Sequence, residues 1–430
     1  MPGGAGTAFW FVLYNTLLYL GVLLCLPFWL FVRLFRGRYR GQFLERMGIL
    51  SPEVRGQFGQ AKAIWVHAAS AGETASAVPM LRALKASLPG HPVLFTVTSR
   101  YGKQMAERRL EGVADAVCFS PLDVPFFCRR FLNAVDPLLY VMVETDIWPN
   151  LLRIAQRRGI PCALASGYAS PRSIPRSFWR AVFSKIDLLL MQTEEDERNI
   201  IARGALPERV SVGGNMKFDA TAGAIPSDEV PALRADFGFR EGVPVIVAGS
   251  TLAEDEAQVL DAIATLRSEG IDLHAIVAPR RQERVPEVMR GLADRDIPAA
   301  LRTERGAAVV VVLDTMGELA GTYNLASASY VGGGFTADVG LHNLIEPLVC
   351  GSPVLFGPHR GKAARVASEV VRFGAGVEVA DAADLLATLR RFLTDDATRD
   401  KLPKAGGELL RHHQGAAVRQ AARISELVQK

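Results

Sequence analysis

The sequence lacks the closely spaced ligands that structural metal sites need. Its five cysteines stand at positions 25, 118, 128, 162 and 350 and form no C-x-x-C pair, and its seven histidines are scattered. Structural zinc sites draw their Cys and His ligands from short, regular spacings. We therefore expect no structural zinc ion, and unpaired cysteines are typical of the reducing cytosol.

Two nucleotide-binding signatures are also missing. The glycine-rich stretches do not follow the G-x-G-x-x-G order of dinucleotide-binding folds, and they carry no P-loop lysine. The chain also has no solenoid-length repeat and no low-complexity tract. These absences disfavour a nicotinamide-dependent dehydrogenase and a P-loop NTPase.

Charge is absent from one long stretch near the start. Residues 8–32, AFWFVLYNTLLYLGVLLCLPFWLFV, contain no Asp, Glu, Lys or Arg. At about 1.5 Å per residue, a helix of this length exceeds the roughly 30 Å hydrocarbon core of a bilayer. The basic residues that follow it are Arg33, Arg36, Arg38, Arg40 and Arg46. The positive-inside rule then predicts a single-pass transmembrane helix, a signal-anchor, with the rest of the chain in the cytoplasm.

Other interpretations of this stretch remain. Asn15, Thr16 and Pro27 weaken the span, so a buried helix of a soluble protein or a re-entrant anchor is the second interpretation. A cleaved signal peptide is the third, although the stretch lacks the basic start and the small-residue cleavage site of such peptides.

From about residue 62 the sequence alternates short apolar runs with amphipathic stretches. The runs are AIWVHA, PVLFTV, LLYVMVE, CALAS, DLLLMQ and RVSVGG, and, after a break over residues 218–242, VPVIVAGS, LHAIVAP, AAVVVVL, ASYVGGG and SPVLFGP. Runs that are apolar on both faces predict strands of parallel sheets, covered by helices on right-handed crossovers. A chain of 430 residues with 49% apolar residues is long enough for two such domains. We expect an α/β fold of two Rossmann-like, doubly wound domains facing a cleft, behind the N-terminal transmembrane helix.

The stretch HAASAGETASAVPML places one carboxylate, Glu73, at the corner between a predicted strand and a predicted helix. An acid near a helix N-terminus gains about 0.3–1 kcal/mol from the helix dipole, so a helix-start role is one interpretation. Ser70 and Gly72 leave room for a ligand beside it, which favours a catalytic role. Position alone does not decide between the two roles.

Two more charged residues fall at strand ends of the first half. Glu144 closes the run LLYVMVE, and Lys217 lies in GGNMKFD after the last strand. Ligands of doubly wound sheets bind outside the carboxyl ends of the strands, so Glu144 is expected to share a cleft with Glu73. The alternatives are a buried structural hydrogen bond for Glu144 and a solvated Lys217.

The second half carries a basic motif at a strand end. APRRQER places Arg280, Arg281 and Arg284 directly after a predicted strand. Guanidinium groups bind phosphate or carboxylate bidentately, and a basic first turn is unfavourable for a helix. The motif therefore predicts an anionic ligand.

The strongest local signal is YVGGGFTADVGLHNLIEP. It predicts a strand, a glycine-rich turn and a helix that opens at about His342–Asn343, with Glu346 one turn in. Free N–H groups at such an opening would hold a phosphate, and Glu346 could accept hydrogen bonds from ribose hydroxyls. DTMGEL places Met316, Gly317 and Glu318 at another helix start, a weak signal by itself.

Together these segments resemble the Kdo transferases, membrane-anchored glycosyltransferases that move 3-deoxy-D-manno-octulosonic acid (Kdo) from CMP-Kdo to a lipid A precursor. The resemblance covers essentially the whole chain and rests on the anchor and on HAASAGE, VETDIWPNLL, GNMKFD, AGST, PRRQER, DTMGEL, GGGF…HNLIEP and PVLFGPH, in the family's order. It implies a GT-B fold and an inverting reaction in lipopolysaccharide synthesis with no essential metal or other cofactor. CMP-Kdo would be the co-substrate and lipid IVA the acceptor.

The resemblance also assigns domains and residues. The implied segments are a membrane anchor with its basic flank (1–48), an acceptor-binding domain (49–220), a linker (221–240), a donor domain (241–405) and a C-terminal helix that crosses back (406–430). Glu73 would be the general base, with Glu144 and Lys217 beside the reacting centre. The implied CMP-binding residues are Pro279, Arg280, Met316, Gly317, Glu318, Asn343, Leu344, Ile345 and Glu346.

Three motifs depart from the common family forms. Arg281 and Gln282 replace the usual middle of PRHPER, STLAEDE has Leu252 where many members have a histidine and a glycine, and the loop before Leu341 is slightly longer. The role of residues 254–256 and the closure of the loop around Asp338 are therefore open.

Two rival functions remain at this stage. One is a GT-B transferase that uses a UDP-sugar and another membrane acceptor, and the other is a non-catalytic membrane-associated nucleotide-binding relative. We expect location at the cytoplasmic face of the inner membrane of a Gram-negative bacterium and no nucleic-acid partner. Basic residues of SPRSIPRSFWR, namely Arg172, Arg176 and Arg180, would add bilayer contacts, unless this stretch is an ordinary solvated loop.

Overall fold

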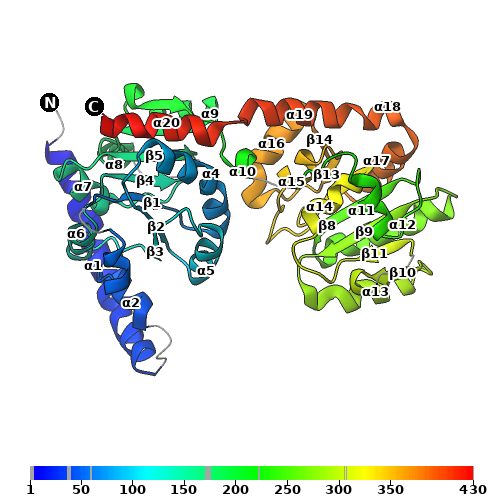
Figure 1. The fold of residues 1–430 in the computed structure, drawn as a ribbon, viewed down its shortest axis with the longest axis horizontal. Coiled ribbons are helices and arrows are strands. Elements are labelled where there is room, and N and C mark those ends of the chain that lie inside the picture. Colours follow the sequence, from blue (N-terminus) through cyan, green and yellow to red (C-terminus); the bar gives the residue numbers. More distant parts are fainter. Residues whose placement is uncertain are drawn as a thin grey trace. The chain divides into compact units, whose positions relative to one another are not determined.

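The computed structural model describes residues 4–35, 40–58, 61–169, 176–220, 223–304, 306 and 308–429, and over 4–7, 25–35, 40 and 41 it describes the backbone alone. The chain forms two compact units (Figure 1). The first comprises Met1–Ala220 and Gly415–Lys430, and the second comprises Thr221–Gln414. Among the basic residues singled out above, Arg36, Arg38 and Arg172 lie outside the described residues.

The first unit is built on a seven-stranded parallel sheet. Its strands are β1 (Ile64–His67), β2 (Val93–Val97), β3 (Ala116–Phe119), β4 (Leu139–Val143), β5 (Cys162–Gly167), β6 (Leu188–Met191) and β7 (Val210–Val212). They are ordered β3-β2-β1-β4-β5-β6-β7, so the order reverses between β1 and β4. Such a reversal point is where doubly wound folds bind ligands.

Helices cover both faces of this sheet. They are α1 (Gly4–Phe35), α2 (Arg40–Arg46), α3 (Pro52–Gly56), α4 (Ala71–Ser87), α5 (Arg100–Arg109), α6 (Pro125–Val135), α7 (Pro149–Arg157), α8 (Arg176–Phe183), α9 (Glu194–Ala202), α10 (Lys217–Ala220) and α20 (Ala416–Gln429). Trp65 and Tyr140 pack on one face with α6, α7 and α8. Val66 and Val141 pack on the other with α4, α5 and α20. Successive strand residues point to opposite faces, which explains the continuous apolar runs in the sequence.

The N-terminal half of α1 packs against the first unit. Tyr14 donates a hydrogen bond to Asp123 (2.9 Å), and Asn15 exchanges hydrogen bonds with Asn150 (3.0 and 2.8 Å). Phe11 is buried. The opposite side of the helix exposes Phe9, Val12, Leu17, Tyr19, Leu20, Leu23 and Leu24. Of the helices in the described part of the chain, none combines the length and the hydropathy needed to cross a membrane.

The second unit repeats the architecture with a second parallel sheet. Its strands are β8 (Val245–Thr251), β9 (His274–Pro279), β10 (Ala299–Leu301), β11 (Val310–Val312), β12 (Ala328–Val331), β13 (Val354–Phe356) and β14 (Gly376–Glu378), in the order β10-β11-β9-β8-β12-β13-β14. The reversal point lies between β8 and β12. STLAEDE and the glycine-rich turn follow these two strands, so the fold brings them together.

The helices of the second unit are α11 (Val230–Asp236), α12 (Ala253–Ser268), α13 (Val285–Ala293), α14 (Leu319–Thr322), α15 (Ile345–Val349), α16 (Ala364–Phe373), α17 (Ala382–Thr394), α18 (Asp396–Arg399) and α19 (Lys401–His413). Residues 221–240 were expected to form a linker. Val230 and Leu233 of α11 instead pack against a buried cluster that includes Phe237 and Phe239, so the described part of that segment is folded into the second unit.

The C-terminal segment also differs from expectation. Instead of one helix from residue 406, the structure has α19 in the second unit and α20 in the first. The break falls at Gly415, whose φ of 75° is left-handed and favours glycine. Asp219 accepts hydrogen bonds from Gly415 N and Ala417 N, both 2.7 Å long, and so caps the start of α20. Within the first unit, α20 lies against α4 (Figure 1).

Candidate active site

The reversal point of the first sheet positions two acids. Glu73 lies in the first turn of α4, which follows β1, and Glu144 follows β4 directly. Because β1 and β4 are neighbours with a parallel register, the two strand ends lie side by side. The fold therefore places both acids at the same sheet edge, where doubly wound domains bind ligands.

Glu73 has the helix-start role that its position suggested. Its Oε2 accepts hydrogen bonds from Ala69 N (2.7 Å) and Ser70 N (3.3 Å), and Ser70 Oγ accepts from Glu73 N (3.2 Å). These bonds complete a capping box. Oε1 has no hydrogen-bond partner among the described residues. One oxygen thus fixes the side chain, and these hydrogen bonds do not use the other.

The electrostatic setting of Glu73 suits a base. Burial raises the pKa of its carboxyl, and the nearby charge of Glu144 raises it further, against the lowering effect of the N–H groups of Ala69 and Ser70. A carboxyl with a raised pKa is a stronger proton acceptor once it is ionised.

Glu144 forms an ion pair with Lys217. The Lys217 Nζ lies 2.7 Å from Glu144 Oε1, and the Glu144 side chain is 5% exposed. Glu144 has a left-handed backbone with φ of 63°, a conformation that costs a residue with a side chain about 1–3 kcal/mol. Its N–H is held by Ala165 O at 2.9 Å. The structure therefore brings Glu144 and Lys217 into contact, with Glu73 within electrostatic reach.

The reversal point of the second sheet is organised by Asp255, which is fully buried. Its carboxylate accepts hydrogen bonds from Gly333 N (2.7 Å), Phe335 N (3.2 Å) and Tyr330 Oη (2.7 Å). It also accepts from Leu252 N (2.9 Å) at the start of α12. Asp255 thus fixes the glycine-rich turn. This gives one of the acids of STLAEDE a structural role.

Two positions of this turn require glycine, because neighbouring backbone atoms lie too close to leave room for a Cβ. Gly333 has a φ of 90°, and a Cβ at this position would collide with Gly340 O. A Cβ at Gly334 would collide with the backbone N of Gly357, which follows β13. The turn is therefore compact because its residues have no side chains there.

The helix after the turn begins later than the sequence suggests. We expected it to open at His342–Asn343, but α15 starts at Ile345. Asn343 Oδ1 accepts from Ile345 N, and Asn343 Nδ2 donates to Glu346 Oε1, both at 3.0 Å. Leu344 and Ile345 are buried, so they can offer a ligand only their backbone. A phosphate at this opening would meet fewer free N–H groups than predicted.

The three arginines of APRRQER differ in their exposure and contacts. Arg284 is paired with buried Glu256, whose Oε2 accepts from its Nε (2.8 Å) and Nη2 (2.6 Å). Arg284 is therefore less available to a ligand than predicted, because Glu256 already accepts from two of its guanidinium nitrogens. Arg280 and Arg281 are exposed. Burial, followed by the charge of Arg280, lowers the pKa of His342, which places Arg280 near the glycine-rich turn.

Glu318 is also engaged within the protein. Its carboxylate accepts from Arg302 Nε (3.3 Å), Arg302 Nη2 (3.2 Å) and Thr315 Oγ1. Met316 is 82% exposed, and Gly317 has a φ of 94°. The turn therefore offers a ligand its backbone and Met316 more readily than the Glu318 carboxylate.

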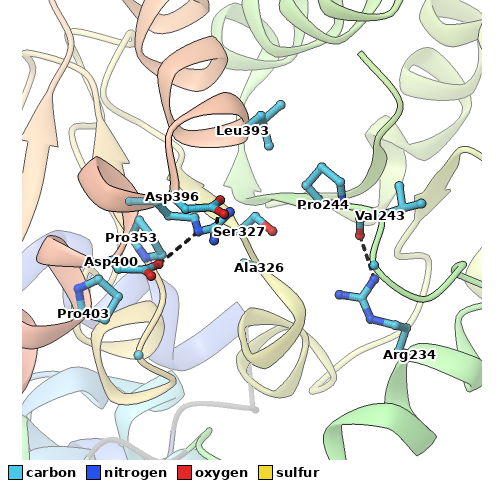
Figure 2. Close-up of a pocket in the computed structure, with 13 residues that line it drawn as sticks. Arg234, Val243, Pro244, Ala326, Ser327, Pro353, Leu393, Asp396, Asp400 and Pro403 are labelled. Atoms are coloured by element: carbon cyan, nitrogen blue, oxygen red, sulfur yellow. Dashed lines mark hydrogen bonds and ion pairs between the residues drawn. The ribbon is translucent and has the colours of Figure 1, made fainter. Parts of the chain in front are cut away.

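A separate pocket of about 440 Å³ lies at the amino ends of the strands of the second sheet, away from the carboxyl ends that carry the motifs (Figure 2). Pro244, Ser327 and Pro353 line it, and each immediately precedes a strand. Asp396 and Asp400 lie on one side, both paired with Arg399. None of the predicted site residues lines it. Within the described chain, no group of three His, Cys, Asp or Glu side chains is placed to hold a metal ion.

Comparison with known proteins decides the family. Residues 41–220 match the model of the 3-deoxy-D-manno-octulosonic-acid transferase family. The chain is 33% identical over 374 residues to 3-deoxy-D-manno-octulosonic acid transferase from Bordetella pertussis, which covers 83% of this chain and 85% of the relative. The chain belongs to the Kdo transferase family. It is therefore a glycosyltransferase. A second Kdo transferase, from Haemophilus influenzae, is 29% identical over 89% of this chain and 90% of its own.

Solved structures show the same fold outside the Kdo transferases. A glycosyltransferase from Rickettsia africae is 9% identical with a TM-score of 0.58, over 86% of this chain and 99% of its own. A UDP-GlcNAc 2-epimerase from Neisseria meningitidis is 13% identical with the same TM-score and coverage. The predicted pair of parallel-sheet α/β domains of the GT-B kind is confirmed.

Sequence reasoning missed four residues that organise the loops of this glycosyltransferase. His67 and Asp146 lie inside HAASAGE and VETDIWPNLL but were not assigned roles. Asp255 was left open, and Arg302 has no motif around it. The available signal was a charged or polar residue close to the end of a predicted strand. Whether such a residue is buried cannot be read from a single position of the sequence.

Proposed function

We propose that this glycosyltransferase moves Kdo from CMP-Kdo to a lipid A precursor, lipid IVA, with inversion at the anomeric carbon and Glu73 as general base. The observation that carries the proposal is the state of Glu73. Two backbone N–H groups fix its Oε2, its Oε1 has no partner among the described residues, and its pKa is raised.

The proposed reaction is a single displacement. Glu73 takes the proton of a glucosamine hydroxyl as that oxygen attacks the anomeric carbon of Kdo, and the bond from that carbon to the phosphate oxygen of CMP breaks. CMP departs with the electron pair. General bases contribute about 10²- to 10⁴-fold to such rates.

Positive charge is needed where negative charge develops. The Lys217 ammonium, held at 2.7 Å by Glu144, would supply it beside the reacting centre. Exposed Arg280 would supply it at the phosphate of CMP. With these two cations in place, we propose that the reaction uses no metal ion and no other cofactor.

For the donor we propose the residues that the resemblance assigns, with roles adjusted to their contacts. Pro279 ends β9 and Arg280 follows it, and Met316–Gly317–Glu318 lie in the turn after β11. Leu344 and Ile345 contribute backbone groups, since their side chains are buried. Asn343 and Glu346, which bond to each other, would reach the ribose.

We also propose that α1 attaches the enzyme to the cytoplasmic face of the inner membrane. Support comes from its outer side, where Leu17, Leu20, Leu23 and Leu24 are 61%, 51%, 64% and 79% exposed. Its inner side is fixed to Asp123 and Asn150. Exposed Arg176 and Arg180 lie on α8, which contacts α1. An apolar face flanked by basic residues suits attachment at the bilayer surface better than a full span.

One flanking residue is used differently from the prediction. The Arg46 guanidinium donates to Thr98 O and lies 4.8 Å from the centre of the Phe119 ring. It therefore stabilises the protein rather than facing lipid.

Flotation with vesicles of anionic phospholipid tests the attachment. The Leu20→Glu/Leu24→Glu variant should lose binding, while Val418→Glu, at an equally open apolar position on α20 (59% exposed), should keep it. Release of the wild type from membranes by alkaline carbonate is expected. Retention in the carbonate pellet would support a transmembrane span instead.

The activity is tested by CMP release and by the mass gain of tetraacyl disaccharide lipid. Glu73→Gln keeps an amide oxygen for the capping box, so its loss of turnover would report the base and not the helix start. A donor screen is part of the test. Preference for a UDP-sugar would favour the first rival function, and saturable CMP binding without turnover on any lipid would favour the second.

A further inference from the structure

A buried histidine connects the two loops that carry the acids. His67 is the last residue of β1 and is fully buried. Its Nε2 lies 2.8 Å from Asp146 Oδ2, and its Nδ1 lies 2.9 Å from Thr96 Oγ1. The side chain therefore links β1 and β2 to the loop after β4.

The partners of the ring fit the tautomer that is protonated on Nε2. Thr96 Oγ1 accepts a hydrogen bond from Trp65 Nε1 (2.8 Å) and can donate its own hydroxyl proton to His67 Nδ1. Thr96 O, 3.1 Å from Nδ1, already accepts from Ala68 N. The Asp146 carboxylate can only accept, so a protonated Nε2 donates a hydrogen bond to it, and Trp148 Nε1 lies 3.4 Å from the same nitrogen. Both ring nitrogens of the buried His67 thus have hydrogen-bond partners, as buried polar groups require.

Asp146 lies two residues after Glu144, in a loop with an unfavourable backbone. Glu144 has a φ of 63°, and Ile147 N closes a tight turn on Thr145 O at 2.9 Å. Strained residues persist where surrounding contacts over-determine them. Here the contacts include Glu144 N to Ala165 O, Lys217 Nζ to Glu144 Oε1, and Asp146 Oδ2 to His67 Nε2.

The other end of the link leads to Glu73. His67 begins HAASAGE, and the turn after it is held by Thr98, whose Oγ1 donates to Ala69 O at 2.8 Å. Ala69 N in turn donates to Glu73 Oε2. The partly buried hydrogen bond between His67 and Asp146 thus joins the segment that leads into the Glu73 turn to the loop that carries Glu144.

We propose that His67 and Asp146 are positioning residues for glycosyl transfer, which hold the carboxylates of Glu73 and Glu144 in the arrangement that the reaction needs. The inference rests on the proposed function. Neither side chain is assigned a contact with substrate, since His67 is fully buried and Asp146 is 23% exposed.

Two variants of Asp146 separate positioning from charge. Asp146→Asn keeps an oxygen that accepts from His67 Nε2 but removes the charge, and Asp146→Ala removes the acceptor. We expect Asp146→Ala to lower kcat about 10- to 100-fold, as misplaced catalytic groups do. The KM for CMP-Kdo should stay unchanged, and Asp146→Asn should stay close to the wild type. Thermal unfolding of each variant checks that both are folded.

A second readout is independent of turnover. The charge of Glu144 raises the pKa of Glu73, so a Glu144 that turns away in Asp146→Ala should let that pKa fall. A purely structural loss of stability would not move it. The pKa is measured by ¹³C titration of labelled carboxyl groups, with the Glu73 signal assigned by Glu73→Gln.

The outcomes are distinct. A lower pKa of Glu73 in Asp146→Ala and an unchanged one in Asp146→Asn support the inference. An unchanged pKa of Glu73 in both variants overturns the inference, because Asp146 would then not hold Glu144 in place. An equal fall of this pKa in both variants also overturns it, because the charge of Asp146 would then be the cause. A wild type with no Kdo transfer would refute the proposed function without affecting this comparison.

Discussion

The ammonium of Lys217 lies 2.7 Å from Oε1 of Glu144, a carboxylate on a left-handed residue at the end of β4. The pair joins the start of α10 to the reversal point of the first sheet. Glu144 thus fixes the position at which the charge of the lysine in GNMKFD is held.

Replacement of Lys217 tests this pair. We expect Lys217→Met to lower kcat about 10²- to 10³-fold, the usual effect of removing one charge that stabilises a transition state. Lys217→Arg should retain more activity because it keeps the ion pair. Kdo transfer measured at saturating donor and acceptor gives the comparison. Equal activity of Lys217→Met and the wild type would show that the cation is structural.

Arg280 and Arg284 should respond differently to the same substitution. Arg280→Met is expected to raise the KM for CMP-Kdo about 10- to 100-fold, since a lost charge-assisted hydrogen bond is worth about 1.5–3 kcal/mol. Arg284→Met leaves the buried Glu256 unpaired and should lower stability, so it is combined with Glu256→Gln. The double variant should bind donor normally. A raised KM in the double variant would return Arg284 to the donor site.

Asp255 should contribute to both the stability and the donor affinity of the second unit. Asp255→Ala leaves the N–H groups of Gly333 and Phe335 without their acceptor, and we expect a loss of about 3 kcal/mol in unfolding free energy. Donor affinity should fall as well. Urea unfolding and CMP titration measure both. If stability falls while CMP affinity stays normal, the glycine-rich turn does not depend on Asp255 for binding.

Asp123 gives a prediction for pH. Burial raises its pKa from 3.8 to about 6, although Asn150 N, Leu151 N and Tyr14 Oη donate to it. Because the folded pKa is the higher one, its contribution to stability is complete below about pH 4 and is lost as the pH rises through about 6. At about 1.4 kcal/mol per pKa unit, the change is about 3 kcal/mol.

The measurement compares the wild type with Asp123→Asn, which has no carboxyl to titrate. The difference between their unfolding free energies should move in favour of the wild type as the pH falls from 7 to 4. A difference that stays constant over this range would mean that Asp123 has an ordinary pKa.

Much of the fold could be predicted because it depends on repeated local patterns. The apolar runs form parallel strands, and the motifs after β1 and β4 and after β8 and β12 meet at the two reversal points. Boundaries were less predictable. Asn343 delays α15 by bonding to Ile345 N, and α11 packs into the second unit through apolar contacts with distant residues.

The prediction of the site was incomplete, and the reason is physical. A sequence shows which residues carry charge, but not which of them find a partner inside the protein. Arg284 and Glu318 looked available and are paired with Glu256 and Arg302. Glu73 was ambiguous between helix start and base, and the structure has the capping box while leaving Oε1 without a partner in the described chain.

The pH profile of kcat/KM for Kdo transfer, measured for the wild type and for Glu73→Gln, tests the central claim most directly. The account predicts an acidic limb above the ordinary pKa of a glutamate, because burial and Glu144 raise the pKa of Glu73. It also predicts that folded Glu73→Gln loses about 10²-fold or more in rate. A folded Glu73→Gln enzyme with near-normal rate and the same acidic limb would contradict it.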